Sequence, residues 1–347
     1  MNRAIDLFSG AGGLSLGLNM AGWDVRVALE YDATAVETHR KNMPDVLHIC
    51  DDIRDVDLSS FREKIDLVAG GPPCQPFSVS GKQLGSSDVR DMVPEFVRAV
   101  REIQPKAFLM ENVSGLTSSR FLPYLEDRLS ELESLGYLVS WKVLNAADFG
   151  VPQNRKRLFV IGTPKDVPFN FPEPTHGPGL KNKYATVTEA LKGCPIDEIN
   201  RAKVAFAKNP ILRKSPFAGM LLNGKGRPLN LKGPAHTIPA SAGGNRTHIL
   251  DPKGILTEYH KQLLAGGSPR LGEVPGCTRL TVRQSARLQT FPDWFEFLGS
   301  RNQRYSQIGN AVPPDFAAIV AAKLIRTLLA KEKSRGASNN KLKTTMT

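Results

Sequence analysis

The sequence lacks the features of secreted, membrane-spanning and disulfide-stapled proteins. Its 347 residues hold only four cysteines, Cys50, Cys74, Cys194 and Cys277, with no C-x-x-C pair, which argues against a disulfide framework and a zinc knuckle. No window approaches the roughly 18 consecutive apolar residues of a membrane span, and the N-terminus has no signal-peptide core. The six histidines are scattered without metal-ligand spacing. We therefore expect a cytoplasmic protein with reduced thiols, no metal site and no membrane association.

Acidic residues are missing from one long stretch. Residues 201–250 contain nine Lys or Arg but no Asp or Glu. The formal charge is +12, and it is regional: residues 166–279 have sixteen Lys or Arg against eight Asp or Glu, residues 331–347 have five against one, and the remainder is balanced. Such a distribution favours a polyanionic partner such as nucleic acid, although charge alone leaves a solvated basic surface equally open.

The first 160 residues alternate short apolar runs with amphipathic segments, which predicts a doubly wound parallel α/β sheet. Expected strands are 4–8, 24–30, 46–53, 65–69, 107–111, 138–144 and 158–162, and apolar periodicity predicts helices from Val93 and Phe121. Proline, glycine and asparagine then become dense until about residue 275. We expect a sheet domain over 1–165, an irregular domain over 166–278, a return to the first domain over 279–330, and a disordered basic tail over 331–347.

Polar residues follow the first three expected strands and suggest an adenosine pocket. A glycine turn with Gly10, Gly12 and Gly13 opens a helix after the first strand, but Ser15 replaces the third glycine of a nicotinamide-binding motif. The next two strands end in Glu30-Tyr31 and Asp52-Ile53, whose acids can accept ribose hydroxyls and an adenine amino group while the tyrosine stacks on the base. Each acid alone is more often a helix cap or a solvated loop residue.

A second group of residues at later strand ends suggests nucleophilic catalysis. Cys74 follows two prolines after the fourth strand, which favours exposure over the inert burial usual for a lone cysteine. Glu111 ends the fifth strand, so sheet topology brings its carboxyl beside that thiol. Arg155 and Arg157 lie after the sixth expected strand and near the seventh, and their guanidinium pair can bind a carbonyl oxygen or a phosphate.

These motifs, in this order, resemble those of the DNA (cytosine-5)-methyltransferases of prokaryotic restriction-modification systems. The resemblance covers most of the chain outside about 165–275. It includes the loop from Phe8 to Gly13, the Pro73-Cys74-Gln75 motif, Glu111-Asn112-Val113, and Gln153-x-Arg155-x-Arg157. Two C-terminal motifs, residues 283–292 and 307–313, also match, with Gln284 departing from the family's usual Glu.

The resemblance implies a Rossmann-like methyltransferase sheet that uses S-adenosylmethionine, with an inserted target recognition domain. It implies that Cys74 adds to C6 of a flipped cytosine in duplex DNA, that Glu111 assists at N3, that Arg155 holds O2, and that Arg157 braces the site. The implied cofactor contacts are Phe8, Gly10, Gly12, Gly13, Glu30, Tyr31, Asp52, Ile53, Pro73 and Asn310.

The resemblance also implies DNA contacts. Gln75 belongs to the nucleophile motif, Ser78, Ser80 and Lys82 lie in a Gly- and Ser-rich segment typical of a closing lid, and the basic insert contributes Lys225, Arg227 and Arg246. A cognate restriction endonuclease acting separately is a further partner that the resemblance allows. Two alternatives stay open: a tRNA substrate with the same chemistry, and a DNA-binding module with an inactive catalytic domain.

Overall fold

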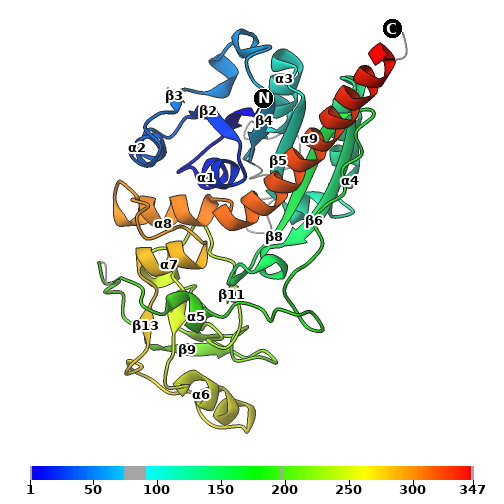
Figure 1. Cartoon of the computed structure of the whole chain (residues 1–347). Coiled ribbons are helices and arrows are strands. Elements are labelled where there is room, and N and C mark those ends of the chain that lie inside the picture. The colour runs from blue at the N-terminus through cyan, green and yellow to red at the C-terminus, as the bar shows by residue number, and fades with distance from the viewer. Residues whose placement is uncertain (1, 74–90, 196–197, 345–347) are drawn as a thin grey trace. The chain divides into compact units, whose positions relative to one another are not determined.

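The strands expected from the alternating pattern pair into one seven-stranded sheet. The computed structural model describes residues 2–73, 91–195 and 198–344, and its sheet order is β3-β2-β1-β4-β5-β8-β6 (Figure 1). Strands β1 to β5 run parallel, whereas β8 is antiparallel to both β5 and β6. The strands are β1 (Arg3–Leu7), β2 (Asp24–Glu30), β3 (Leu47–Cys50), β4 (Leu67–Gly70), β5 (Ala107–Val113), β6 (Tyr137–Asn145) and β8 (Lys156–Pro164). The α/β class expected from the sequence is confirmed.

Helices pack on both faces of this sheet. They are α1 (Gly13–Met20), α2 (Ala33–Asn42), α3 (Val93–Ile103), α4 (Leu122–Ser134) and α9 (Pro314–Thr344). Leu158 and Val160 of β8 belong to the apolar cluster that contains the buried side chains of α3 and α4. Phe159, between them, meets the ring of Phe316 on α9 with centroids 5.1 Å apart, since alternate residues of a strand face opposite sides. Helix α9 packs in turn on α1.

The order of the strands determines where a ligand can bind. Strand β1 lies between β2 and β4, so the chain leaves it in opposite directions along the sheet. In open α/β sheets the crevice for ligands forms at the carboxyl ends of strands around such a switch point. The parallel strands β1, β2, β4 and β5 all end at this edge, and the segments that follow them carry most of the residues expected to be functional.

Helix α9 continues through the segment expected to be disordered. A Cβ at Gly17 of α1 would lie 2.5 Å from Ala317 Cβ, so the close approach of the two helices requires this glycine. Further along α9, Lys331 pairs with Asp166 at 3.2 Å. A helix that is already nucleated extends at little cost per residue, which explains why the polar segment after Ala330 stays helical as far as Thr344.

One helical stretch in the described part of the chain, Arg301–Ser334, is long and apolar enough to cross a membrane. In its most apolar window, 56% is buried inside the protein, as expected for a core helix, so the stretch is weak evidence for a membrane span.

The chain divides into two compact units. Unit 1 comprises Met1–Asn145, Lys156–Glu173 and Pro314–Thr347, and unit 2 comprises Ala146–Arg155 and Pro174–Pro313. Unit 2 has only short elements: β7 (Gln153–Asn154), α5 (Val187–Leu191), β9 (Phe206–Ile211), β10 (Met220–Leu222), β11 (Ala235–His236), β12 (Ile249–Leu250), α6 (Ile255–Leu264), β13 (Thr278–Arg279), α7 (Val282–Leu288) and α8 (Arg301–Asn310). Its apolar cluster includes Leu221, Ile249, Tyr259 and Val274.

These boundaries differ from the expected division at residues 165 and 279. Residues 146–155 and 279–313 were assigned to the first domain, but both belong to unit 2. The reason lies in the hydrogen bonds of Gln153: its Nε2 donates to Gln289 Oε1 at 2.8 Å, and its Oε1 accepts from the amide of Ile238, in the irregular stretch, at 2.9 Å. β7 also pairs with β11. Unit 2 is therefore assembled from segments on both sides of the irregular stretch.

Candidate active site

The loop after β1 turns sharply at the edge of the sheet. Phe8 has a φ of 57°, and Gly10 and Gly12 have φ of 52° and 97°, in the left-handed region that favours glycine. The Gly12 amide donates to Ser9 O at 2.9 Å, which closes the turn. A Cβ at Gly10 would have no heavy atom within 4 Å, so the space beside this residue is open. The loop thus presents bare backbone at an open position, as a nucleotide-type ligand requires.

Glu30, at the end of β2, organises this loop. Its carboxylate accepts the Gly10 amide at 3.0 Å on Oε2 and the Asp32 amide at 2.9 Å on Oε1. Burial raises the pKa of Glu30, which the two amide hydrogen bonds oppose. The next residue, Tyr31, is 70% exposed. Each carboxylate oxygen of Glu30 can accept a hydrogen bond from a second donor. A carboxylate that can still accept hydrogen bonds and an exposed aromatic ring thus lie beside the glycine turn, as the adenosine pocket requires.

Asp52 has a different environment from the one expected. Its side chain caps the short helix Ile53–Asp55 and accepts from Arg54 Nε at 2.9 Å. The Arg54 guanidinium holds the pKa of Asp52 low, at about 2. The carboxylate expected to meet an adenine amino group is thus already paired, while Ile53 beside it is buried.

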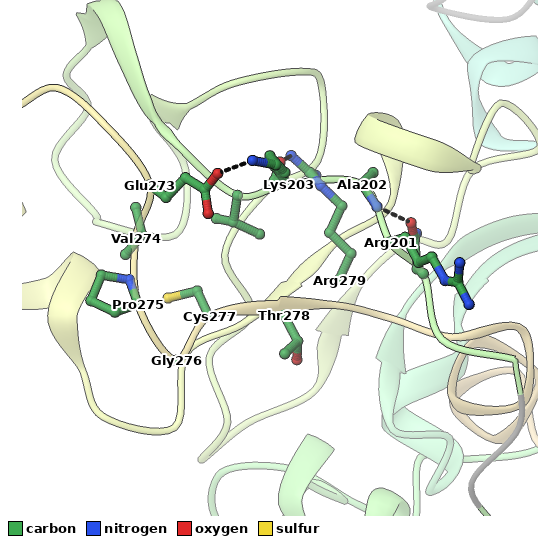
Figure 2. A pocket seen from close by; sticks show the side chains of 12 residues that line it. Arg201, Ala202, Lys203, Glu273, Val274, Pro275, Gly276, Cys277, Thr278 and Arg279 are labelled. Atoms are coloured by element: carbon green, nitrogen blue, oxygen red, sulfur yellow. Dashed lines mark hydrogen bonds and ion pairs between the residues drawn. The ribbon is translucent and has the colours of Figure 1, made fainter.

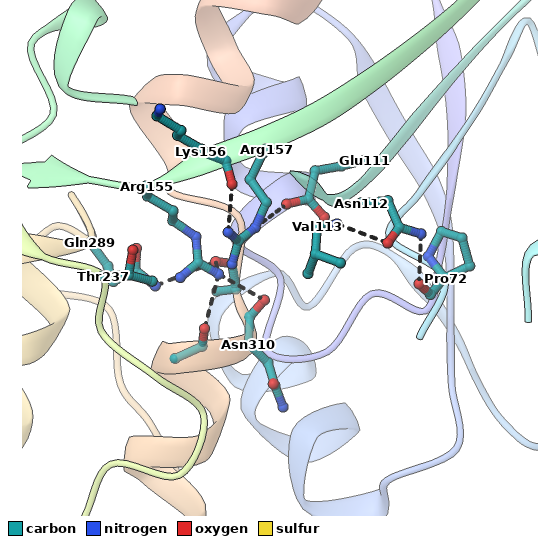
Figure 3. Close-up of polar contacts among 12 residues, drawn as sticks. Pro72, Glu111, Asn112, Val113, Arg155, Lys156, Arg157, Thr237, Gln289 and Asn310 are labelled. Atoms are coloured by element: carbon teal, nitrogen blue, oxygen red, sulfur yellow. Dashed lines mark hydrogen bonds and ion pairs between the residues drawn. The ribbon is translucent and has the colours of Figure 1, made fainter. Parts of the chain in front are cut away.

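Glu111 and Arg157 form a buried ion pair at the end of β5. Arg157 Nε lies 2.9 Å from Glu111 Oε1, and the two side chains are 15% and 10% exposed. Figure 3 shows them facing each other, because β5 and β8 are neighbours with Val113 opposite Arg157. Burial lowers the pKa of Arg157 despite the attraction of Glu111. A pair in which desolvation outweighs attraction contributes little net stability, which points to a role in the site's chemistry.

The segment leading to the expected nucleophile lies against this pair. A Cβ at Gly71 would stand 3.3 Å from Glu111 Oε2, so the chain passes the carboxylate closely. Asn112 Nδ2 donates to Pro72 O at 3.3 Å, as Figure 3 shows. Pro73 is also held, because its carbonyl accepts from the Met92 amide at 3.4 Å. The expected residues Cys74, Gln75, Ser78, Ser80 and Lys82 lie outside the described residues.

Arg155 belongs to unit 2 and has contacts unlike those of Arg157. It is 1% exposed, and its guanidinium donates to the backbone oxygens of Ile238 at 3.3 Å and of Gly309 and Ala311 at 2.9 Å each. The side chain expected to hold a substrate carbonyl therefore bonds backbone carbonyls of its own unit. Asn310, expected at the cofactor, is exposed in the same segment.

The three basic residues expected to contact DNA lie on adjoining segments of unit 2. Lys225, Arg227 and Arg246 are all exposed. The Lys225 amide donates to Asn245 O at 3.1 Å, and the Arg227 amide donates to His248 Nδ1 at 3.2 Å. The two segments therefore run side by side, and the backbone positions of these three exposed cations lie close together.

Unit 2 also contains a pocket of about 460 Å³ formed by residues 200–204 and 273–279 (Figure 2). Lys203 and Glu273 form an ion pair across it. Arg279 is buried, and its guanidinium donates to Thr247 O and Asn223 O at 3.0 Å each. Lys203, Glu273 and Arg279 thus already have protein partners, and these contacts do not indicate which ligand the pocket would bind.

Sequence reasoning missed a buried polar cluster behind the glycine loop. Asp6, Ser15, His39 and His48 are joined by hydrogen bonds. The histidines carried no spacing signal, and only the position of Asp6 directly before the loop could have drawn attention to it. In the described part of the chain, no group of three or more His, Cys, Asp or Glu is placed to hold a metal ion.

An open, mostly parallel sheet with a glycine turn after β1 and a buried acid at the end of β2 is typical of α/β proteins that bind a nucleotide-type cofactor. The family model of the C-5 cytosine-specific DNA methylases matches residues 2–326. The chain is 37% identical over 340 residues to the Type II methyltransferase M.FnuDI of Fusobacterium nucleatum, covering 95% of this chain and 96% of the relative. It is 35% identical to the Type II methyltransferase M.NgoMIV of Neisseria gonorrhoeae, covering 94% and 97%.

Solved structures agree with this family. A putative DNA modification methyltransferase encoded within an E. coli prophage superposes with a TM-score of 0.66 at 25% identity, covering 94% of this chain and 99% of the other. A DNMT2 mutant of Spodoptera frugiperda gives the same TM-score, 0.66, at 16% identity over 95% and 100%, a likeness of fold alone. The chain belongs to the C-5 cytosine-specific DNA methylase family. Its enzymatic class is DNA (cytosine-5-)-methyltransferase.

Proposed function

We propose that this enzyme methylates C5 of a cytosine within a specific duplex DNA sequence, by adding a thiolate to C6 of a flipped base. The observation that carries the proposal is the Glu111–Arg157 pair, with Gly71 against its carboxylate. Cys74 follows Gly71 by three residues in the sequence. An acid and a cysteine are the two groups that activation of a cytosine ring requires.

The residues around the glycine loop fit S-adenosylmethionine as the methyl donor. The amides and open space of the loop suit the amino acid part, the Glu30 carboxylate suits the ribose hydroxyls, and the exposed Tyr31 ring suits the adenine. Phe8, Gly12, Gly13, Ile53 and Pro73 complete the proposed contacts, and Asn310 is proposed as a contact on the strength of its sequence motif alone. Asp52 is paired with Arg54, so we assign its part in binding to the turn that it caps. The bound cofactor supplies an electrophilic methyl group.

The protein's part in the reaction is to make C5 nucleophilic. The Cys74 thiolate forms a bond to C6, the C5–C6 π electrons move toward N3 through the ring, and Glu111 protonates or hydrogen-bonds N3. Arg157 holds the Glu111 carboxyl in place through their ion pair. After methylation of C5, a base removes the C5 proton, the C5–C6 double bond re-forms, and the thiolate leaves. Arg155 acts indirectly, by holding the 309–311 backbone.

Unit 2 is the proposed target recognition domain. Its exposed Lys225, Arg227 and Arg246 provide cations for phosphates and base edges. We place Gln75, Ser78, Ser80 and Lys82 at the DNA on the strength of the sequence motif. The enzyme would act in the cytoplasm as the modification half of a restriction-modification pair, with the endonuclease as a separate protein.

A covalent trap tests the nucleophile. Duplex DNA with 5-fluorocytosine at the target should give a denaturation-resistant complex, because fluorine cannot leave as a proton and elimination of the thiol is blocked. Cys74→Ala should lose both the complex and methylation yet keep DNA binding. Cys50→Ala, which removes an exposed thiol, is the matched control and should behave as the native enzyme.

The target sequence needed for the 5-fluorocytosine duplex would be identified by bisulfite sequencing of DNA from a host that expresses the enzyme. A trapped complex that persists in Cys74→Ala would contradict the assignment. Methyl transfer to tRNA but to no DNA duplex would contradict the substrate, and binding of DNA without any methyl transfer would favour an inactive binding module.

A further inference from the structure

Asp6 is an acid buried behind the glycine loop. It lies on β1 two residues before Phe8, where the loop begins, and it is fully buried. Its Oδ2 accepts the Ser15 hydroxyl at 2.6 Å, while its Oδ1 has no hydrogen-bond partner among the described residues. Burying an ionised carboxylate with a hydrogen bond to only one of its two oxygens costs free energy. Burial, with a smaller contribution from the nearby Glu30 carboxylate, outweighs the hydrogen bonds from Ser15 and raises the pKa of Asp6 to about 7.

A chain of hydrogen bonds connects Asp6 to a half-buried histidine. Ser15 Oγ lies 2.9 Å from Nε2 of the buried His39, and His39 Nδ1 lies 2.7 Å from His48 Nε2. Burial lowers the pKa of His39 to about 3 and also lowers that of His48, which faces Arg40 and Glu37. His39 is therefore neutral at physiological pH and can pass a proton from one ring nitrogen to the other.

The same chain supports the cofactor loop directly. A Cβ at Gly12 would lie 2.7 Å from His39 Cδ2, so the imidazole forms the surface against which the loop rests. Ser15 is on α1, which begins at the loop, and His39 is on α2, which follows Glu30. The cluster thus contacts or flanks each part of the proposed cofactor site on β1 and β2.

We propose that Asp6 is a buried counter-charge for the cofactor, which loses its proton through Ser15 and His39 to His48 when the positively charged S-adenosylmethionine binds. The inference rests on the proposed cofactor. When Asp6 is protonated, its hydroxyl donates to Ser15 Oγ. The Ser15 hydroxyl then donates to His39 Nε2, and the His39 Nδ1–H donates to His48 Nε2. On ionisation the Asp6 O–H bond breaks and every hydrogen bond reverses. One N–H bond forms on His48, which then gives the proton to water.

Two ligands that differ in charge separate this role from a purely structural one. S-adenosylhomocysteine lacks the methyl group and the positive charge on sulfur but otherwise has the same groups. If Asp6 ionises in response to charge, S-adenosylmethionine should gain affinity over S-adenosylhomocysteine by up to about tenfold between pH 6 and pH 8, the limit for a shift of about one pKa unit. A polar cluster that only supports the loop would affect both ligands equally.

Calorimetric titration of the full-length enzyme without DNA measures both affinities, and two buffers of different ionisation enthalpy count the protons released. At pH 7 we expect release of up to about 0.5 proton with S-adenosylmethionine and none with S-adenosylhomocysteine. Asp6→Asn keeps the shape of the side chain and should abolish the release and the pH-dependent difference. Asp24→Asn, an exposed acid on β2 paired with Arg26, is the matched control and should retain both.

A second variant keeps the proposal testable if Asp6→Asn fails to fold. Ser15→Ala removes the hydrogen bond that lowers the pKa of Asp6, so the midpoint of the pH dependence should move up by about one pH unit. A ratio of affinities that is constant from pH 6 to pH 8, or that survives in Asp6→Asn, would overturn the proposal while leaving the cofactor assignment intact. Failure of the native enzyme to bind either ligand would instead refute the proposed cofactor.

Discussion

Removing the Arg157 guanidinium should destabilise unit 1, because it leaves the buried Glu111 carboxylate without its ion-pair partner. Arg157 Nε lies 2.9 Å from Glu111 Oε1, and the two side chains are 15% and 10% exposed, so water can replace little of the lost interaction. Breaking one side of a buried ion pair typically costs about 3–5 kcal/mol. Since both groups keep some contact with solvent, we expect Arg157→Met to cost about 3 kcal/mol, at the lower end of that range.

The double variant Arg157→Met/Glu111→Gln should recover most of this loss. It leaves no uncompensated charge, and replacement of a buried pair by neutral groups is often close to neutral in stability. Arg26→Met, which breaks an exposed pair with Asp24, should cost less than about 1 kcal/mol. Turnover should behave differently, because Glu111→Gln alone should reduce kcat by about 10²–10⁴-fold and the double variant should not restore it.

Urea unfolding followed by circular dichroism, with methyl transfer to target DNA measured on the same samples, tests this reasoning. A cost below about 0.5 kcal/mol for Arg157→Met would refute the claim that the pair is effectively buried. A double variant as unstable as the sum of the two single variants would show that the groups do not interact.

Three further outcomes are expected. Glu30→Gln should weaken cofactor binding by about 1.5–3 kcal/mol in calorimetry, because the ribose hydroxyls lose a charged acceptor. Replacement of Lys225, Arg227 and Arg246 by alanine should reduce the slope of log affinity for DNA against log salt by up to about 3, as measured by fluorescence anisotropy. The pKa of Asp6, raised to about 7, gives the native state more protons than the unfolded state above pH 4. The contribution of Asp6 to stability should therefore fall as pH rises to about 7, and Asp6→Asn should gain up to about 4 kcal/mol relative to the native enzyme across this range in thermal unfolding at each pH.

The sheet and its strand-end residues could be predicted because period-two patterning and chain order determine them. All seven expected strands are present, since each has an apolar run bounded by turn residues. The expected third strand, 46–53, was too long. The structure ends β3 at Cys50, because Asp52 caps a short helix by accepting the Arg54 amide. A cap of this kind ends a strand through local side-chain bonding that hydrophobic patterning does not record.

The buried cluster and the unit boundaries could not be predicted in this way. Asp6 and His48 are 42 positions apart, and their connection depends on how β1, α1, α2 and β3 pack. The boundary of unit 2 depends on backbone acceptors such as Ile238 O and Gly309 O, which are the same for every residue type. The only sequence signal at this boundary is the spacing Gln153-x-Arg155, which places two side chains with several hydrogen-bond donors close together in the chain.

The spacing Arg155-x-Arg157 suggested two guanidinium groups in one site, because residues two apart on a strand face the same side. The structure places them in different units, since the first segment of unit 2 ends at Arg155 and β8 of unit 1 begins at Lys156. Arg155 donates to several backbone carbonyls of unit 2, which lysine with one compact ammonium cannot reproduce. Arg155→Lys should therefore destabilise unit 2 and weaken DNA binding while cofactor binding is kept. Arg157→Lys should lower kcat, because it displaces the Glu111 carboxyl with which Arg157 pairs. It should keep DNA binding, because this change is confined to unit 1. Anisotropy, calorimetry and methyl transfer measured for both variants would separate these effects, and equal losses of DNA binding would contradict the division of tasks.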